Sequence, residues 1–198
     1  MFISLEGIDG SGKSTQARLL AGALGPETLL IREPGGTDAA ERIRELLADP
    51  SLELDPFAEL LLFSAARADL VSRVIRPALE ANLDVVADRF ADSSVAYQGG
   101  ARGLGTSHVL SLTDTVIDGL WPDLTILLQV DPEVGLARAE GEDRFESEGL
   151  ELQRSVAEAY REIAQIASDR VVIVDAEGTV EQVHGRVMEV LDGRQTAA

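Results

Sequence analysis

The chain has 198 residues, of which 45% are hydrophobic and 26% charged, as in an ordinary folded domain and unlike a disordered chain. Its 17 basic and 35 acidic residues give a net charge of −18, which argues against a protein that grips nucleic acid or an anionic membrane over a broad surface. The length predicts a single domain, residues 1–198. Because the chain has no cysteine and no apolar stretch long enough to span a bilayer, we expect it in the reducing cytoplasm.

Short apolar runs rich in β-branched residues alternate with stretches of helical periodicity. The predicted strands, each continuous and apolar as in a buried parallel sheet, are Phe2–Leu5, Thr28–Ile31, Asp84–Ala87, Leu124–Val130 and Val171–Val174. The predicted helices are Lys13–Leu24, Ala39–Ala48, Pro56–Asn82, Ser107–Gly119, Leu150–Ser168 and Val180–Leu191. Capping signals occur at Asp55-Pro56, Asp131-Pro132 and Thr179–Gln182. The alternation predicts a three-layer α/β domain, with a parallel sheet of about five strands and helices on both faces.

One stretch differs in composition from the rest of the chain. Residues Glu133–Glu151 contain seven acids, three glycines, Arg138 and Arg144. We interpret this stretch as an exposed loop or short lid, with the lid at about residues 138–149.

The first predicted strand leads into a phosphate-binding sequence, the phosphate loop Gly7-Ile8-Asp9-Gly10-Ser11-Gly12-Lys13-Ser14, followed by Thr15. It fits G-x-x-x-x-G-K-[ST] between a strand and a helix, where glycines let backbone N–H groups surround phosphate oxygens. Lys13 can reach the β- and γ-phosphates, and the Ser14 hydroxyl can ligate Mg²⁺. Of the 17 basic residues Lys13 is the one lysine, at the position that requires it. The sequence therefore predicts a nucleoside-triphosphate site in a P-loop NTPase fold.

Other features narrow the class of P-loop protein. A guanine-specific switch GTPase reads its base with N-K-x-D, which needs a second lysine, and a large ATPase needs a longer chain. The class that remains is kinases with a small acceptor. An anionic acceptor requires fixed cations, and Arg89 ends the third predicted strand at the sheet edge where such folds bind ligands. Asp9 and Asp88 could order Mg²⁺ and its waters, or could instead cap a helix or pair with an arginine.

Five sequence blocks carry a resemblance to one family. They are Leu5–Thr15, Arg32–Thr37, Leu62–Arg67, Asp88–Gln98 and Asp143–Glu146. In this order they resemble the bacterial thymidylate kinases over nearly the whole chain. The resemblance implies transfer of the γ-phosphoryl group of ATP to dTMP, giving dTDP and ADP for dTTP synthesis. It also implies Mg²⁺ and a homodimer formed through the helix at 56–82.

The resemblance also implies roles for individual residues. ATP would bind Gly7, Ile8, Asp9, Gly10, Ser11, Gly12, Lys13, Ser14, Thr15 and Arg138. The dTMP site would comprise Glu33, Pro34, Phe63, Arg67, Arg89, Ser94, Tyr97 and Gln98. The catalytic residues would be Lys13, Arg89, Arg144 and Asp9, and the metal ligands Ser14, Asp9 and Asp88. In these roles Phe63 stacks on thymine, Arg67 reaches a base carbonyl, and Tyr97 packs against the deoxyribose C2′.

The expected lid is where the chain departs from the family pattern. It is a few residues shorter than is common. The resemblance implies that a phosphate loop without an arginine is complemented by positive charge from the lid, so we expect Arg138 or Arg144 to supply it, with Arg144 the stronger candidate. Arg138 could stack on adenine or pair with Glu142. Two alternatives remain open at this stage: a kinase for another nucleoside monophosphate, and a regulatory P-loop ATPase that acts through a partner.

Overall fold

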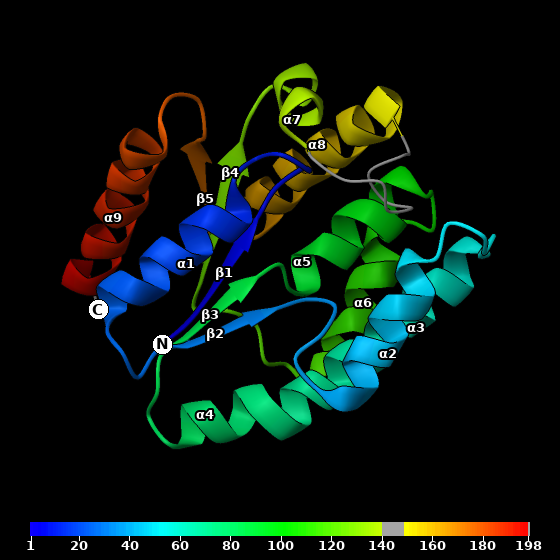
Figure 1. The fold of residues 1–198 in the computed structure, drawn as a ribbon, viewed down its shortest axis with the longest axis horizontal. Helices are drawn as coiled ribbons and strands as arrows, with labels where there is room; N and C mark the ends of the chain where they lie inside the picture. Colours follow the sequence, from blue (N-terminus) through cyan, green and yellow to red (C-terminus); the bar gives the residue numbers. More distant parts are fainter. Residues whose placement is uncertain (140–148, 198) are drawn as a thin grey trace.

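The sheet has five parallel strands in the order β2-β3-β1-β4-β5 (Figure 1). The protein is seen here in a computed structural model that describes residues 1–139 and 149–197. The strands are β1 (Phe2–Glu6), β2 (Leu29–Arg32), β3 (Val85–Asp88), β4 (Leu124–Gln129) and β5 (Val171–Asp175). Each lies within one residue of its predicted bounds, and the predicted α/β fold class is confirmed.

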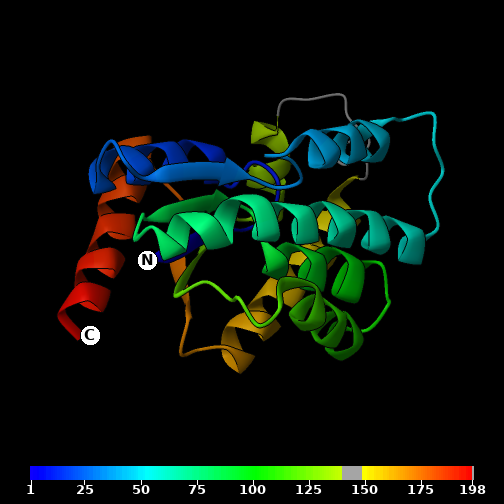
Figure 2. The same cartoon turned by 90° about the horizontal axis from the view of Figure 1, so that it is seen from below.

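Helices cover both faces of the sheet. They are α1 (Lys13–Leu24), α2 (Asp38–Ala48), α3 (Pro56–Leu70), the π-helical segment η1 (Val71–Ile75), α4 (Arg76–Glu80), α5 (Ala91–Ser94), the π-helical segment η2 (Val95–Ala101), α6 (Thr106–Ile117), α7 (Pro132–Arg138), α8 (Gly149–Ile166) and α9 (Val180–Ala197). Helices α1 and α9 pack together on one face, and η2 packs between α6 and α8 on the other (Figures 1 and 2). None of the described helices combines the length and apolar character needed to cross a bilayer.

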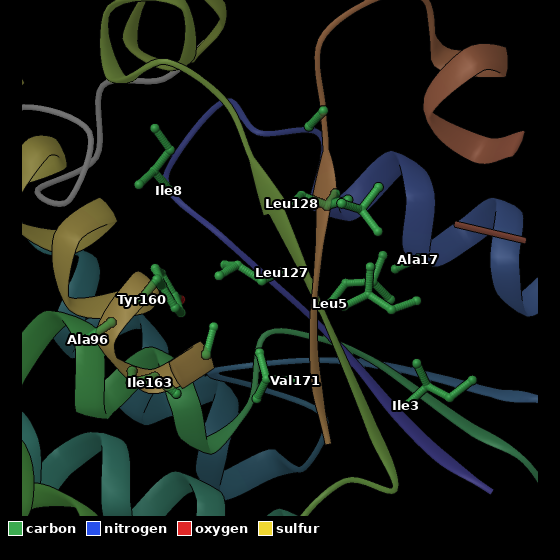
Figure 3. Packing of buried hydrophobic residues seen from close by; sticks show 14 of the residues in the cluster. Ile3, Leu5, Ile8, Ala17, Ala96, Leu127, Leu128, Tyr160, Ile163 and Val171 are labelled. Atoms are coloured by element: carbon green, nitrogen blue, oxygen red, sulfur yellow. The ribbon is translucent and has the colours of Figure 1, made fainter. Parts of the chain in front are cut away.

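The core lies between the sheet and these helices, in two clusters. The larger one contains Leu5 and Leu127 of the central strands together with Tyr160 of α8 (Figure 3). The smaller one includes Phe2 and Phe90, whose ring centroids lie 4.9 Å apart in an edge-on arrangement. All five residues of β1 are buried. This packing fixes β1 between β3 and β4, so the loops that follow β1 and β3 meet at the carboxyl edge of the sheet.

The predicted capping signals are confirmed. The Asp55 carboxylate accepts a hydrogen bond from the Phe57 N–H at 2.9 Å, and the Asp131 carboxylate caps α7 in the same way. At the start of α9, the Thr179 N–H donates to the Gln182 side chain at 2.9 Å. The Gln182 N–H donates in return to the Thr179 hydroxyl. These bonds satisfy backbone donors that a helix start leaves free.

The predicted helix Pro56–Asn82 is confirmed as a continuous helical run, but it ends earlier than predicted and is not α-helical throughout. The structure forms α3, η1 and α4 as one long helical run that stops at Glu80 (Figure 2). Pro77 lies inside the run without a backbone N–H, and the π-helical turn directly before it changes the hydrogen-bond spacing. Asn82 has a φ of 61°, a left-handed conformation that cannot continue a helix.

Two helical segments were missed by the predicted elements. Residues 91–101 form α5 and η2, whose two glycines and mixed packing hide any regular apolar period.

The interpretation of 133–151 as an exposed loop or lid is wrong at both ends, because Pro132–Arg138 forms α7 and α8 begins at Gly149. The helix α9 extends to Ala197, beyond the predicted end at Leu191. Residues 140–148 of the expected lid lie outside the described residues.

Candidate active site

A cleft of about 640 Å³ lies at the carboxyl edge of the sheet. The predicted residues that line it are Asp9, Gly10, Ser11, Gly12, Lys13, Ser14, Thr15, Glu33, Pro34, Phe63, Arg67, Asp88, Arg89, Ser94, Tyr97, Gln98 and Arg138. Gly7 and Ile8 lie behind this surface, with the Ile8 side chain in the core. Arg144 lies outside the described residues. The fold therefore brings the residues expected for ATP and those expected for dTMP to one cleft.

The phosphate loop wraps around the amino end of α1. Lys13 is 6% exposed, and its Nζ donates to the Ile8 carbonyl at 2.6 Å and to the Ser11 hydroxyl at 3.3 Å. Burial lowers the pKa of Lys13 to about 8. Gly10 has a φ of 70°, and the Gly135 carbonyl of α7 occupies the space that a Cβ at Gly10 would need. The loop thus holds its lysine ready at the cleft while α7 packs directly against its backbone.

Arg89 and Asp9 form an ion pair across the centre of the cleft. The Arg89 Nη2 donates to Asp9 Oδ1, and Nη1 donates to the Gly7 carbonyl at 3.1 Å. Asp9 Oδ2 accepts from Gln153 Nε2 at 2.8 Å and from the Tyr97 hydroxyl at 3.2 Å. Burial acts to raise the pKa of Asp9, but the charges of Arg89 and Lys13 outweigh it and hold that pKa below its usual value. Arg89 therefore has its ion-pair partner inside the cleft.

A buried glutamate, which the sequence reasoning missed, supports the turn that carries Arg89. Glu6 is fully buried, and burial raises the pKa of its carboxyl group. Its oxygens accept from the Phe90 N–H, the Ser93 hydroxyl and the Tyr160 hydroxyl, each at 2.7 Å. Arg89 itself has a φ of 70°, an uncommon conformation for a residue with a side chain. The Glu6 contacts hold this turn in place, and an acid at the end of an otherwise buried strand was the available signal.

Arg67 lies in the floor of the acceptor side of the cleft. It is 2% exposed, and its Nε donates to Glu33 Oε2 at 2.8 Å. Its Nη1 donates to the Ser94 hydroxyl at 2.9 Å, and its Nη2 to the Phe90 carbonyl at 3.2 Å. Phe63 lies one helical turn earlier on α3 and lines the same cleft. These contacts give Arg67 a single position from which to present charge to an acceptor.

Glu59 and Arg102 also line the cleft and were missed from the sequence. Glu59 precedes Phe63 by four residues, and Phe63 precedes Arg67 by four, so one face of α3 supplies all three. That spacing was the signal that could have found Glu59. Arg102 follows η2, whose helical character the sequence did not reveal.

The opposite end of the cleft lies between α7 and the loop before α9. Arg138 lines it, and its Nη1 donates to the Ala176 carbonyl at 3.3 Å. The expected alternative partner of Arg138, Glu142, lies outside the described residues. Gly178 and Val180 line the same end of the cleft. Arg138 thus links α7 to the loop after β5 by a hydrogen bond, and its planar guanidinium group lines this end of the cleft.

The removal of Arg67 should destabilise the protein as well as weaken acceptor binding. We expect Arg67→Met to lower the free energy of unfolding by about 3–5 kcal/mol, because it leaves the buried Glu33 carboxylate without its counter-ion. Adding Glu33→Gln should recover much of that stability but not acceptor binding. Urea unfolding and the KM for acceptor would test both parts, and a single variant as stable as the parent protein would contradict the prediction.

The fold and the site define a class of protein. A parallel sheet places a phosphate loop with a buried lysine in the same cleft as the buried arginine Arg67 and the ion-paired Arg89. This is the architecture of a P-loop kinase that phosphorylates a small anionic acceptor, the nucleoside monophosphate kinases. A sequence model described as thymidylate kinase matches residues 5–187. The chain belongs to the thymidylate kinase family.

Individual relatives agree with this assignment. The thymidylate kinase of Halothermothrix orenii is 44% identical over 202 residues, covering 98% of this chain and 97% of the relative. That of a Synechococcus species is 46% identical over 199 residues, covering 98% and 95%. The crystal structure of thymidylate kinase from Ehrlichia chaffeensis is similar with a TM-score of 0.81 and 36% identity, over 97% of this chain and 98% of that one.

Proposed function

We propose that this protein transfers the γ-phosphoryl group of ATP to dTMP, giving dTDP and ADP for dTTP synthesis. The observation that carries the proposal is the single cleft, which joins the phosphate loop to the acceptor surface formed by Phe63, Arg67 and Ser94. Similarity to thymidylate kinases over nearly the full chain supports dTMP in preference to another nucleoside monophosphate.

In this mechanism the protein positions two anions and neutralises their charge. Lys13 and the backbone N–H groups of the phosphate loop bind the β- and γ-phosphates of ATP. The Arg89 guanidinium exchanges its contact with Asp9 for the acceptor phosphate, using the planar fork that suits phosphate oxygens. The γ-phosphoryl group then passes directly to the acceptor oxygen, with no phosphorylated enzyme. The chain has no cysteine, and neither of its histidines lines the cleft.

The donor set of the cleft suits Mg²⁺ carried by ATP better than a metal bound by protein alone. Among the described residues no three acidic or histidine side chains gather into a metal site. Of the three expected ligands, Ser14 and Asp88 offer oxygen donors on the cleft wall, and Asp9 offers one more when Arg89 moves to the acceptor phosphate. Mg²⁺ commonly binds through one or two such groups plus phosphates and waters. When bound, it would neutralise charge that develops on the phosphates.

A coupled assay of ADP release over a panel of nucleotide acceptors tests the proposal. We expect dTMP to be phosphorylated with a kcat/KM well above those of AMP, GMP and dCMP. Equal rates with a purine acceptor would instead indicate a different nucleoside monophosphate kinase. ADP release that does not depend on any acceptor would indicate a regulatory ATPase.

Tyr97 is expected to set the preference for deoxyribose over ribose. Its ring lies 5.1 Å from the Arg89 guanidinium and its hydroxyl contacts Asp9, so a substrate sugar beside it meets a fixed aromatic wall. Tyr97→Ala should narrow the ratio of kcat/KM for dTMP over the ribonucleotide by about tenfold, whereas Tyr97→Phe should keep it. Equal ratios in all three proteins would remove this role from Tyr97.

The homodimer, the lid and the location are also proposals. The exposed apolar side chains of Phe57 and Leu61 on α3 support pairing of two copies through the helical run at 56–82. Light scattering with Leu61→Arg, which should yield monomers, tests the pairing. A single domain with a lid at about 138–149, catalytic charge from Arg144 and a cytoplasmic location remain predictions.

A further inference from the structure

Gln98 and Glu59 form a buried polar pair on the acceptor side of the cleft. Gln98 is 3% exposed and Glu59 is 1% exposed, and both line the cleft. Nε2 of Gln98 donates to Oε1 of Glu59 at 2.9 Å. A carboxamide carries its oxygen and its nitrogen on opposite edges, so a partner for one of them fixes the direction of the other.

Gln98 lines the cleft with a carboxamide whose nitrogen is paired to Glu59 and whose oxygen is left for another partner. Within the described part of the chain, Gln98 Oε1 accepts no hydrogen bond. The side-chain atoms that are both buried and without a partner there are Glu33 Oε1, Ser64 Oγ and Thr113 Oγ1. Gln98 Oε1 does not belong to that group, so it keeps accessible surface. It is a fixed acceptor presented to whatever binds.

The negative charge of Glu59 allows only one orientation of the Gln98 carboxamide. Arg102 contacts both of its oxygens, with Nε 3.3 Å from Oε1 and Nη2 3.4 Å from Oε2. Glu59 also lies in the first turn of α3, where the helix dipole favours an anion. The ion pair with Arg102 supplies a counter-charge to the Glu59 carboxylate inside the cleft. An ionised carboxylate can only accept hydrogen bonds, so it must face the NH₂ group of Gln98 and never its oxygen.

We propose that Glu59 is a positioning residue that selects the acceptor base by locking the Gln98 carboxamide with its oxygen toward the cleft. A base that meets this oxygen must offer an N–H. N3 of thymine or uracil carries a hydrogen, whereas N3 of cytosine is itself an acceptor and would leave two acceptors opposed. This role of Glu59 rests on the proposed function and makes it more specific. Glu59 would exclude cytosine without contacting the base.

The test compares acceptors in a Glu59→Gln variant. The neutral amide at position 59 can donate or accept, so it satisfies Gln98 in either orientation. We expect the ratio of kcat/KM for dTMP over dCMP to fall about tenfold or more, with a raised KM for dTMP and an unchanged KM for ATP. The binding penalty for dTMP methylated at N3 should shrink in parallel. Where dCMP reacts too slowly for kinetics, the Kd of each acceptor measured by calorimetry is compared in place of kcat/KM.

Controls separate positioning from a structural role. Glu80→Gln, which removes an exposed charge at the end of the same helical run, should leave the ratio unchanged. When Gln98 is already replaced by alanine, adding Glu59→Gln should not change the ratio of kcat/KM for dTMP over dCMP any further. If Glu59→Gln does not fold, Arg102→Met serves as the second variant, because it removes the counter-charge beside the Glu59 carboxylate.

The outcomes distinguish this inference from the proposed function. A dTMP-to-dCMP ratio that stays constant in both Glu59→Gln and Arg102→Met would overturn the role of Glu59, as would equal losses with both acceptors. A parent protein that does not phosphorylate dTMP at all would overturn the proposed function instead.

Discussion

Lys13→Ala is expected to lower kcat by about 10²- to 10³-fold, the usual cost of removing one preorganised charge from a transition state. The lysine acts on phosphate charge and contributes little to packing. The Ile8 carbonyl that it contacts also accepts the Ser11 N–H, so it keeps a partner in the variant. We therefore expect the free energy of unfolding to stay within about 1 kcal/mol of the parent value. Steady-state kinetics and urea unfolding measure the two quantities.

A matched control removes a cation that lies far from the cleft. Arg161 is exposed on α8 and does not line the cleft, so Arg161→Gln should leave kcat unchanged. Near-normal turnover by Lys13→Ala would contradict the assignment of the phosphate loop. A loss of activity that accompanies unfolding would show a structural effect instead.

Arg89→Ala is expected to lower kcat by about a hundredfold or more and to raise the KM for dTMP, with a smaller effect on the KM for ATP. Arg89 lies in the cleft at the junction between the phosphate loop and the acceptor side, where a guanidinium can contact both phosphates. Its loss leaves Asp9 with the Tyr97 and Gln153 hydrogen bonds but without its counter-ion. Kinetics with both substrates varied would measure the split.

Two further variants sharpen this result. Arg89→Lys keeps the charge but loses the planar fork, so it should recover only part of the activity. Arg73→Ala removes an arginine whose side chain is 71% exposed and pairs with Asp69 on the surface, and it should be neutral. If Arg89→Ala retained most of its kcat, the main catalytic charge would have to come from another arginine, and Arg144 would be the next to test.

The strands were predictable because each is a short apolar run, a pattern that local sequence carries. The central strand β1 is buried throughout, whereas the edge strands β2 and β5 expose Leu30 and Ile173. Helix starts at Asp55 and Thr179 were predictable because capping depends on residues three or four positions apart. The helical segment at 91–101 was not, because its residues pack against both α6 and α8 and show no single apolar face. The change to π-helical spacing at Val71–Ile75 could be seen only from the hydrogen bonds of the folded backbone.

At the site, the sequence alone predicted the phosphate loop, because phosphate binding needs glycines, a lysine and a hydroxyl at fixed spacing. The acceptor residues were predicted only through the resemblance to a family, and their roles stay predictions. Which side chains pair across the cleft was decided only by the tertiary structure. The partners Arg89 and Asp9 are 80 residues apart, and Gln98 and Glu59 are 39 apart. Their pairing depends on the strand order that places β3 beside β1 and on the packing of η2 near α3. The spacing of residues along the sequence does not predict these contacts, because they form only when the strands pair and the helices pack on the sheet.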